Sequence, residues 1–302
     1  MIDIIIRAGS FVFIIFLGWF LKKIGFFKQE DFTLLSKITI RITLPCASIV
    51  SFAGMQIDPS MLSLVFMAMA CGFVYIGAGF LMNRKTSREQ QAFEMLNLAG
   101  YNIGAFVIPF AQSFLGAMGV VAAGIFDVGN AVIVLGGAFS LACMVKDGTG
   151  FSFKRLGKSL ATSVPFVVYL IMMILNLAHV TIPRPVLSVA GIVGNANAFM
   201  AMLMIGVGFR LESNGAQIKT LVRLLLIRYG AGLVFALLFY YALPFALEVR
   251  QALVILAFAP IGSAVPGFTG EMKGDVGLSS ALNSLSIVIS IVIIVSLLFV
   301  ML

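Results

Sequence analysis

Ten long apolar stretches cover most of this chain and constrain its fold more than any other feature. A helix needs about 20 mostly apolar residues to cross a bilayer, and each stretch has roughly that length. Hydrophobic residues make up 61% of the 302 residues and charged residues only 11%, whereas soluble domains carry about 25% charged residues. The sequence therefore predicts an all-α membrane protein with ten transmembrane helices. The predicted spans are residues 3–21, 33–53, 60–81, 92–114, 119–143, 160–178, 186–208, 218–242, 250–268 and 276–300.

The positive charges alternate between the loops in the manner of a multi-pass membrane protein. If the N-terminus lies outside, the outer loops hold only Arg184 and Arg250. The cytoplasmic loops then hold Lys22, Lys23, Lys28, Arg84, Lys85, Arg88, Lys146, Lys154, Arg155, Lys158, Arg210, Lys219, Arg223 and Lys273. The positive-inside rule therefore predicts a protein of the cell membrane with both termini outside. This bias explains the net charge of +8, so no nucleic-acid partner is expected.

The two halves of the chain resemble each other when one is shifted by 158 positions. Asn102 then falls on Pro260, Gly119 falls on Gly277, and Pro109 falls one residue from Pro266. Five spans per half is an odd number, so two copies of one unit would cross the membrane in opposite senses. The sequence predicts a first repeat over 1–145 and a second, inverted repeat over 146–302, as in many secondary transporters.

The fourth and ninth spans contain helix-breaking residues at matching places. Proline removes a backbone donor, and glycine lowers helix stability. Freed backbone groups are tolerated in a membrane only where protein or a water-filled cavity satisfies them. One such break would suggest a simple proline kink, whereas a matched pair indicates a binding site. The residues predicted to bind substrate at these breaks are Asn102, Gly104, Pro109, Pro260, Gly262, Ser263 and Pro266.

A helix that restarts near the bilayer centre presents free N–H groups and the positive end of its dipole. Two antiparallel broken helices would direct two such ends toward one point. This geometry favours a carboxylate or another anion as the ligand.

Polar residues inside the spans are candidates for coupling transport to an ion gradient. Asp127 in the fifth span is costly in hydrocarbon, so it should face the protein interior or carry a proton. Asn130 lies three residues on, on the same helix face, and Asn283 in the tenth span aligns loosely with this region. Asp127 and Asn130 are predicted to form a site for H⁺ or Na⁺. The alternative is a structural hydrogen bond to a neighbouring helix.

Three further polar residues lie within spans and admit more than one role. Arg228 in the eighth span would pair with Asp127, bind an anionic substrate, or extend its charge to the interface. Asn195 and Asn197 in the seventh span would line the substrate path or bond across helices. His179 is the single histidine, which rules out a histidine metal cluster or a Ser-His-Asp triad within this chain. No enzyme activity and no cofactor beyond a coupling ion are predicted.

The chain resembles the auxin efflux carrier family, bacterial branch, over nearly its full length. The resemblance rests on Leu44-Pro45, on Asn102 with Pro109 seven residues later, on Ala259-Pro260, on Gly274-Asp275 and on Asp127-x-x-Asn130. Two positions depart from the family pattern. Tyr101 stands where plant carriers have a proline, which puts auxin-like specificity in doubt, and Phe199 stands where many relatives have a proline.

The resemblance implies a fold similar to that of sodium–bile acid symporters. Spans 1, 2, 6 and 7 would form a scaffold, and spans 3–5 and 8–10 a mobile transport unit in which spans 4 and 9 cross. Asn102, Pro109, Pro260 and the polar face of the fifth span would contact substrate, and Pro45 is included in the predicted site. A homodimer through scaffold helices is also implied.

These observations together predict a secondary active transporter of a small organic anion, a mono- or dicarboxylate. It would work by alternating access and be coupled to protons or sodium. The alternatives are a channel or uniport facilitator of the same fold, and a membrane receptor that binds the ligand without moving it.

Overall fold

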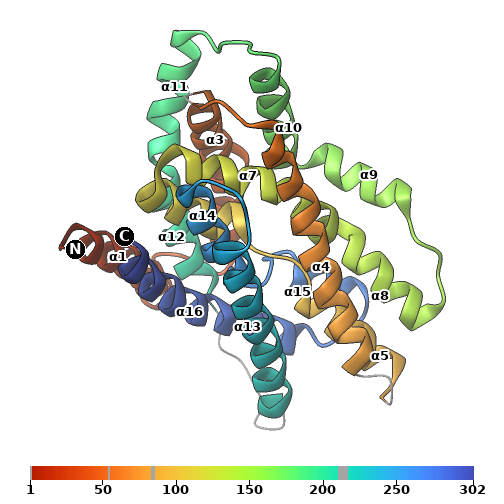
Figure 1. Ribbon diagram of the computed structural model, residues 1–302. Helices are drawn as coiled ribbons and strands as arrows, with labels where there is room; N and C mark the ends of the chain where they lie inside the picture. Colours follow the sequence, from red (N-terminus) through yellow and green to blue (C-terminus); the bar gives the residue numbers. More distant parts are fainter. Residues whose placement is uncertain (1, 54, 83–85, 210–216) are drawn as a thin grey trace.

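The computed structural model describes residues 2–53, 55–82, 86–209 and 217–302 (Figure 1). These described residues form helices joined by short connections and contain no β-strand, which confirms the all-α prediction. Arg84, Lys85 and Arg210 of the charge pattern lie outside the described residues.

The described part of the first 147 residues contains eight α-helices and five short 3₁₀ or π-helical segments, labelled η. They are α1 (Ile2–Lys23), α2 (Asp31–Ile38), η1 (Thr39–Thr43), α3 (Leu44–Ala53), η2 (Pro59–Leu62), α4 (Ser63–Met82), α5 (Arg88–Leu98), η3 (Ile103–Val107), α6 (Ile108–Phe110), η4 (Ala111–Leu115), α7 (Gly116–Val132), η5 (Ile133–Gly137) and α8 (Ala138–Asp147).

The described residues of the second half form eight more α-helices. They are α9 (Phe153–Thr162), α10 (Val164–Leu177), α11 (Arg184–Asn195), α12 (Asn197–Gly208), α13 (Ile218–Tyr241), α14 (Leu247–Ala257), α15 (Val265–Glu271) and α16 (Val276–Met301).

Seven helices in the described residues are long and apolar enough to cross a membrane, or eight if the bent pair α9–α10 counts as one span. The ten-span topology therefore stays a prediction. Two features account for the lower number. The stretch Arg88–Asp147 counts once, although its backbone adopts a positive φ at Gly100 and Gly116. The predicted ninth span is divided into α14 and α15, and each is too short to cross alone.

Close helix contacts depend on glycine. A Cβ on Gly206 of α12 would lie 2.1 Å from the Ile15 carbonyl oxygen of α1, and a Cβ on Gly129 of α7 would lie 2.0 Å from the Val65 carbonyl oxygen of α4. Small residues let membrane helices approach until their backbones touch. These glycines therefore fix the packing of α1 on α12 and of α4 on α7.

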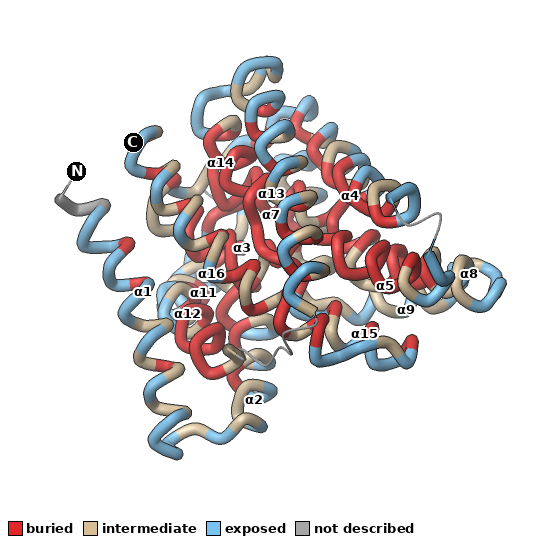
Figure 2. Tube along the Cα trace, turned by 90° about the horizontal axis from the view of Figure 1, so that it is seen from below, coloured by how far each residue is buried: buried red, intermediate tan, exposed pale blue. Residues whose placement is uncertain are grey.

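The most buried helices are the first halves of the two broken spans. Every residue from Gln91 to Leu98 of α5 is buried, as is every residue from Gln251 to Ala257 of α14. Figure 2 shows α7 and α14 among the buried segments near the centre of the molecule, and α5 as a buried segment toward the side of α8 and α9.

The sixth span differs from its prediction. Residues 160–178 were expected to form one helix after a polar loop, but α9 occupies that loop and meets α10 at a bend of 75°. Pro165 lies in the first turn of α10. Proline is tolerated there, whereas inside a helix that continued from α9 it would lack an N–H donor and clash with the preceding turn. The membrane-crossing part shrinks to the 14 residues of α10.

Candidate functional site

Both predicted breaks are present in the structure. In the fourth span, α5 ends at Leu98 and the helix resumes at Ile103, with Gly100 at φ 78° between them. In the ninth span, α14 ends at Ala257 and α15 begins at Val265. Glycine reaches a left-handed conformation without a Cβ clash, which explains how the chain turns at residue 100.

The two breaks touch each other through their backbones. The Asn102 N–H donates to the Pro260 carbonyl oxygen at 2.9 Å, and these are the two residues that the 158-residue shift aligns. Val134 of η5 packs against both segments, because a Cβ on Gly100 or Gly262 would lie 2.9 or 2.5 Å from its Cγ2. The broken spans therefore cross at one place.

Arg228 of α13 joins the two breaks through hydrogen bonds from its guanidinium group. Its side chain is only 1% exposed. It donates to the carbonyl oxygens of Leu98 at 2.7 Å and Gly100 at 3.0 Å, and to those of Ala259 at 2.8 Å and Pro260 at 3.0 Å. A cation is favoured at the C-terminal end of a helix, and here one guanidinium serves two such ends.

This geometry differs from two of the roles considered for Arg228 from the sequence, and binding of an anionic substrate stays a prediction. The side chain is buried rather than extended to the interface, and it forms no ion pair with Asp127. The rings of Tyr75 and Tyr101 lie 5.2 and 5.1 Å from the guanidinium, within the range of cation–π attraction. The Tyr75 hydroxyl donates to the Arg228 carbonyl oxygen at 2.9 Å, so the arginine is held at both ends.

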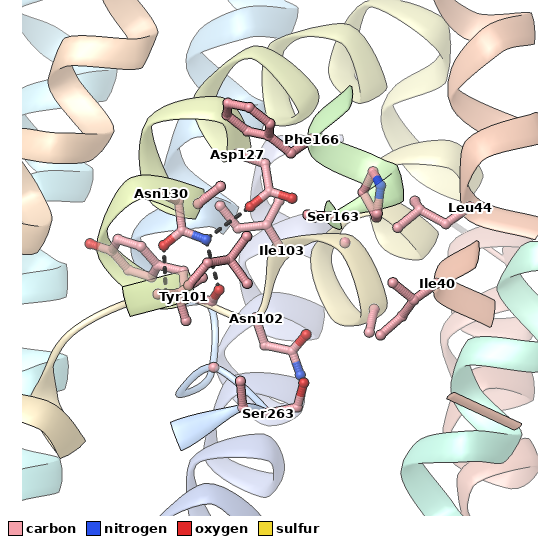
Figure 3. A pocket seen from close by; sticks show the side chains of 18 of the residues that line it. Ile40, Leu44, Tyr101, Asn102, Ile103, Asp127, Asn130, Ser163, Phe166 and Ser263 are labelled. Atoms are coloured by element: carbon pink, nitrogen blue, oxygen red, sulfur yellow. Dashed lines mark hydrogen bonds between the residues drawn. The ribbon is translucent and has the colours of Figure 1, made fainter. Parts of the chain in front are cut away.

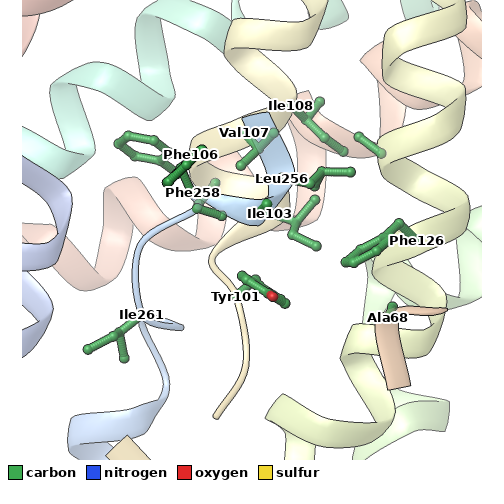
Figure 4. Packing of buried hydrophobic residues seen from close by; sticks show 14 of the residues in the cluster. Ala68, Tyr101, Ile103, Phe106, Val107, Ile108, Phe126, Leu256, Phe258 and Ile261 are labelled. Atoms are coloured by element: carbon green, nitrogen blue, oxygen red, sulfur yellow. The ribbon is translucent and has the colours of Figure 1, made fainter. Parts of the chain in front are cut away.

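Apolar side chains fill the space beside the crossing. Figure 4 shows Tyr101, Phe126, Leu256 and Phe258 around the two break segments. The Tyr101 and Phe126 rings meet edge to face with their centroids 5.9 Å apart, and all four side chains are buried.

One cavity, of about 160 Å³, lies where the crossing meets α7 and α10 (Figure 3). The structure brings six of the predicted site residues to its wall. They are Asn102, Gly104, Asp127, Asn130, Gly262 and Ser263. A Cβ on Gly104 would lie 2.8 Å from Leu44 Cδ2 and 3.6 Å from Asp127 Oδ2, so this glycine keeps the cavity open beside the carboxylate.

Asp127 and Asn130 have separate tasks in this wall. The Asn130 amide nitrogen donates to Asp127 Oδ1 and to the Tyr101 carbonyl oxygen, both at 2.9 Å, and its oxygen accepts from the Tyr101 N–H at 2.9 Å. Asn130 thus satisfies the backbone of the fourth-span break. Asp127 is half-buried, lines the cavity, and has no ion-pair partner among the described residues.

The Asn102 side chain lies between two cavities. Its residue is 6% exposed, and its amide has no hydrogen-bond partner in the described part of the chain. Its amide atoms are not fully buried. They face the cavities that this residue lines, where a bound solute or water would supply hydrogen bonds. Figure 3 shows it next to Ser263, and both residues line both cavities.

The second cavity, of about 270 Å³, lies between the ninth-span break, α2, α12 and α16. Pro266 and Asn283 line it, and so do Ser280 and Ser284. The Asn283 amide nitrogen donates to the Ile261 and Gly262 carbonyl oxygens at 2.9 and 3.3 Å. Asn283 therefore supports the ninth break as Asn130 supports the fourth.

The serines of α16 complete that support. Ser286 Oγ accepts from the Ile261 N–H at 3.0 Å, and Ser290 Oγ donates to the Phe258 carbonyl oxygen at 2.6 Å. These two serines satisfy backbone groups that the break leaves free.

Six predicted site residues line neither cavity, and one of them is Arg228. Pro45 and Pro109 are buried within helical segments, and Pro260 contributes its carbonyl to the crossing. Asn197 is buried and accepts from Thr43 Oγ1 at 3.1 Å, whereas Asn195 is exposed at the end of α11. The two asparagines therefore do not share a face, and the structure gives Asn197 a bond across helices.

Sequence reasoning missed Tyr169 and Ser163, which line the first cavity. Tyr169 is 1% exposed, and a Cβ on Gly104 would lie 3.9 Å from its hydroxyl. A hydroxyl within the apolar run of α10 was a signal for Tyr169. For Ser163, the signal was weaker: it is a polar residue two positions before Pro165.

Comparison with known proteins supports a transport role. The chain matches the family model described as "Membrane transport protein" over residues 5–147, which span α1 to α8. No curated protein matches the chain. Assignment to the bacterial branch and likeness to bile-acid symporters stay predictions. Residues 5–147 of this chain are therefore similar to the membrane transport proteins, the family of the auxin efflux carriers.

Proposed function

We propose that this protein is a secondary active transporter of a small organic anion, with its substrate site at the crossing of the two broken spans. The observation that carries the proposal is the position of Asn102. Its backbone joins the breaks, and its unpartnered side-chain amide lines a cavity on each side of the crossing.

The donor groups in the first cavity suit an anion. Residues 103–115 are helical after the break, and the first residues of such a helix have free N–H groups and a positive dipole end. Gly104 and Ala105 at that end line the cavity. The amide of Asn102 and the hydroxyl of Ser263 add neutral donors, so a carboxylate would be held without an arginine or lysine.

Asp127 provides the argument for coupling. It is the one charged side chain among the described residues that line the first cavity. An anion next to a carboxylate is repelled, so binding would be favoured when a proton or a sodium ion neutralises Asp127. The substrate and the coupling ion would then enter together.

The same observation supports a second candidate, a cationic solute. A lone carboxylate beside neutral hydroxyl and amide groups attracts a positive charge. In that case Asp127 would bind the solute itself. An uptake panel that contains organic cations separates the two functions.

Alternating access would use the two cavities in turn. They lie on opposite sides of the crossing, and Asn102 and Ser263 line both. The first also borders Ile40 and Tyr169 of the predicted scaffold, and the second borders Phe32 and Met204. A shift of the transport unit against the scaffold would open one cavity and close the other. The 5+5 inverted repeat, the homodimer and the outward termini belong to this proposal.

Uptake by proteoliposomes tests the proposal. Mono- and dicarboxylates are offered with an inward proton or sodium gradient, and the Asn102→Leu variant is compared with the wild type. We expect at least a tenfold loss of uptake, since one buried hydrogen-bonding group is worth about 1.4 kcal/mol or more. Asn195→Leu is the matched control, because Asn195 is exposed and lines neither cavity. Unchanged uptake of every accepted solute by Asn102→Leu would refute the site.

Accumulation separates the remaining alternatives. A coupled transporter concentrates its substrate against a gradient and saturates. A channel or uniporter only equilibrates it, and a receptor binds the solute without uptake. Enzymatic turnover is tested by product analysis of the recovered solute.

A further inference from the structure

The ten-residue helix α9 has a sequence pattern that neither the crossing nor the cavities use. Lys154 and Lys158 lie four residues apart and are therefore on one face, whereas Phe153, Leu156 and Leu160 have the spacing of the opposite face. Short helices with one basic and one apolar face lie in the interface of a membrane. No residue of α9 is buried.

The bend before α10 places α9 along the membrane surface. The 14 residues of α10 extend about 21 Å at 1.5 Å per residue, less than the roughly 30 Å of a hydrocarbon core. The chain then turns by 75° instead of continuing. Figures 1 and 2 both show α9 at the periphery of the molecule.

Contacts of Arg155 and Leu156 with the rest of the protein hold α9 in place. Arg155 pairs with Glu271 of α15, and its guanidinium lies 4.2 Å from the centroid of the Phe139 ring of α8. Leu156 lies over the kink of the fifth span, 3.7 Å from the position of a Cβ on Gly136. The side of α9 that carries Arg155 and Leu156 therefore packs against the rest of the protein.

Lys154 and Lys158 differ from Arg155 in this respect. Lys154 and Lys158 are exposed, and neither has an ion-pair partner in the ranges that the structure describes. Phe153, at the start of the helix, is 78% exposed. A basic pair next to an uncovered apolar side chain matches a phosphate group with its acyl chain below it.

We infer that α9 is a docking site for anionic phospholipid, with Lys154 and Lys158 on the headgroup and Phe153 among the upper acyl carbons. Charge complementarity favours a bilayer lipid over a second protein. A phospholipid has an anionic headgroup at the depth of the two lysines and acyl carbons at the depth of Phe153. Each lysine near an anionic surface strengthens binding about fivefold.

Fluorescence quenching by brominated lipids tests this inference in the full-length protein. Trp19 is the single tryptophan, so the Trp19→Phe/Phe153→Trp variant reports from α9 alone. It is reconstituted in bilayers that contain equal mole fractions of phosphatidylglycerol and phosphatidylcholine, with bromine on one or the other. We expect brominated phosphatidylglycerol to quench at least about twice as strongly.

Two comparisons make the result specific. Adding Lys154→Gln and Lys158→Gln should abolish the excess. The unfolding temperature should stay the same, because neither lysine has an ion-pair partner among the described residues. A Trp19→Phe/Val234→Trp variant reports from an exposed position of α13 and should show equal quenching by both lipids. High salt should also reduce the excess on α9, since exposed charges are screened.

Three outcomes would overturn the inference. Equal quenching by the two lipids at position 153 would mean that α9 meets the bilayer without selecting a headgroup. An excess that persists without the lysines or at high salt would remove their role. Absence of quenching by either lipid would mean that α9 is covered by protein or water. None of these measurements depends on transport, so they stand apart from the test of the substrate site.

Discussion

The fourth-span and ninth-span breaks solve the same problem with different side chains. At the fourth break, one amide, Asn130, bonds both backbone groups of Tyr101. At the ninth break, Asn283, Ser286 and Ser290 divide the task. The carboxylate of Asp127 lies only beside the first cavity. The comparison teaches that structural support is present on both sides of the crossing, whereas the charge available for coupling is on one side.

Arg228 is shared by the two breaks, so its loss should have the largest effect. Arg228→Met removes a donor from four carbonyl oxygens, of which only that of Pro260 keeps another, the Asn102 N–H. Each of the three unsatisfied groups costs about 1–3 kcal/mol. We expect destabilisation of ~4 kcal/mol or more, seen as a large fall in unfolding temperature and in the yield of folded protein in detergent.

Arg184→Met is the control for that measurement, because Arg184 is exposed at the start of α11. Equal stability of the two variants would show that Arg228 does not hold the crossing together.

Asp127→Asn should alter transport more than stability. The substitution keeps the shape and removes the charge that a proton or sodium ion would neutralise. If Asp127 carries the coupling ion, stimulation of uptake by the gradient should fall about tenfold or more, within the usual range of coupling energies. External acid should then stimulate the wild type and leave the variant unchanged.

Asp147→Asn at the exposed end of α8 is the matched control and should keep the response. A normal gradient response in Asp127→Asn would assign Asp127 a structural role.

The two asparagines test the comparison between the breaks directly. Asn130→Leu removes three hydrogen bonds at the fourth break, and Asn283→Leu removes donation to two carbonyls at the ninth, where Ser286 and Ser290 remain. We expect losses of ~3 kcal/mol and ~2 kcal/mol in that order, measured as unfolding free energies. The reverse order would contradict the division of support described above.

The smallest effect concerns the apolar contact between the breaks. A Cβ on Gly262 would meet Val134 Cγ2 at 2.5 Å, so Gly262→Ala should cost ~1–2 kcal/mol through overpacking. Val134→Ala in the same chain should recover part of that loss. An absence of coupling between the two substitutions in a double-mutant cycle would show that Val134 does not bridge the breaks.

The sequence alone determined the features that depend on local chemistry. Apolar length predicted membrane helices, and glycine and proline predicted the breaks near Gly100 and Pro260, because each acts on its own backbone. The position of Asp127 on one helix face with Asn130 also followed from helical periodicity.

Only the tertiary structure decided which polar groups meet. Arg228 is 128 residues from Gly100 in sequence, and no local pattern indicates that its guanidinium satisfies carbonyls in both breaks. The burial of Asn197 against Thr43, the position of Tyr169 in the cavity wall, and the bend of 75° between α9 and α10 are equally non-local. In hydrocarbon every freed backbone group needs a partner, and the partner is whichever side chain the packing brings near, which the sequence does not state.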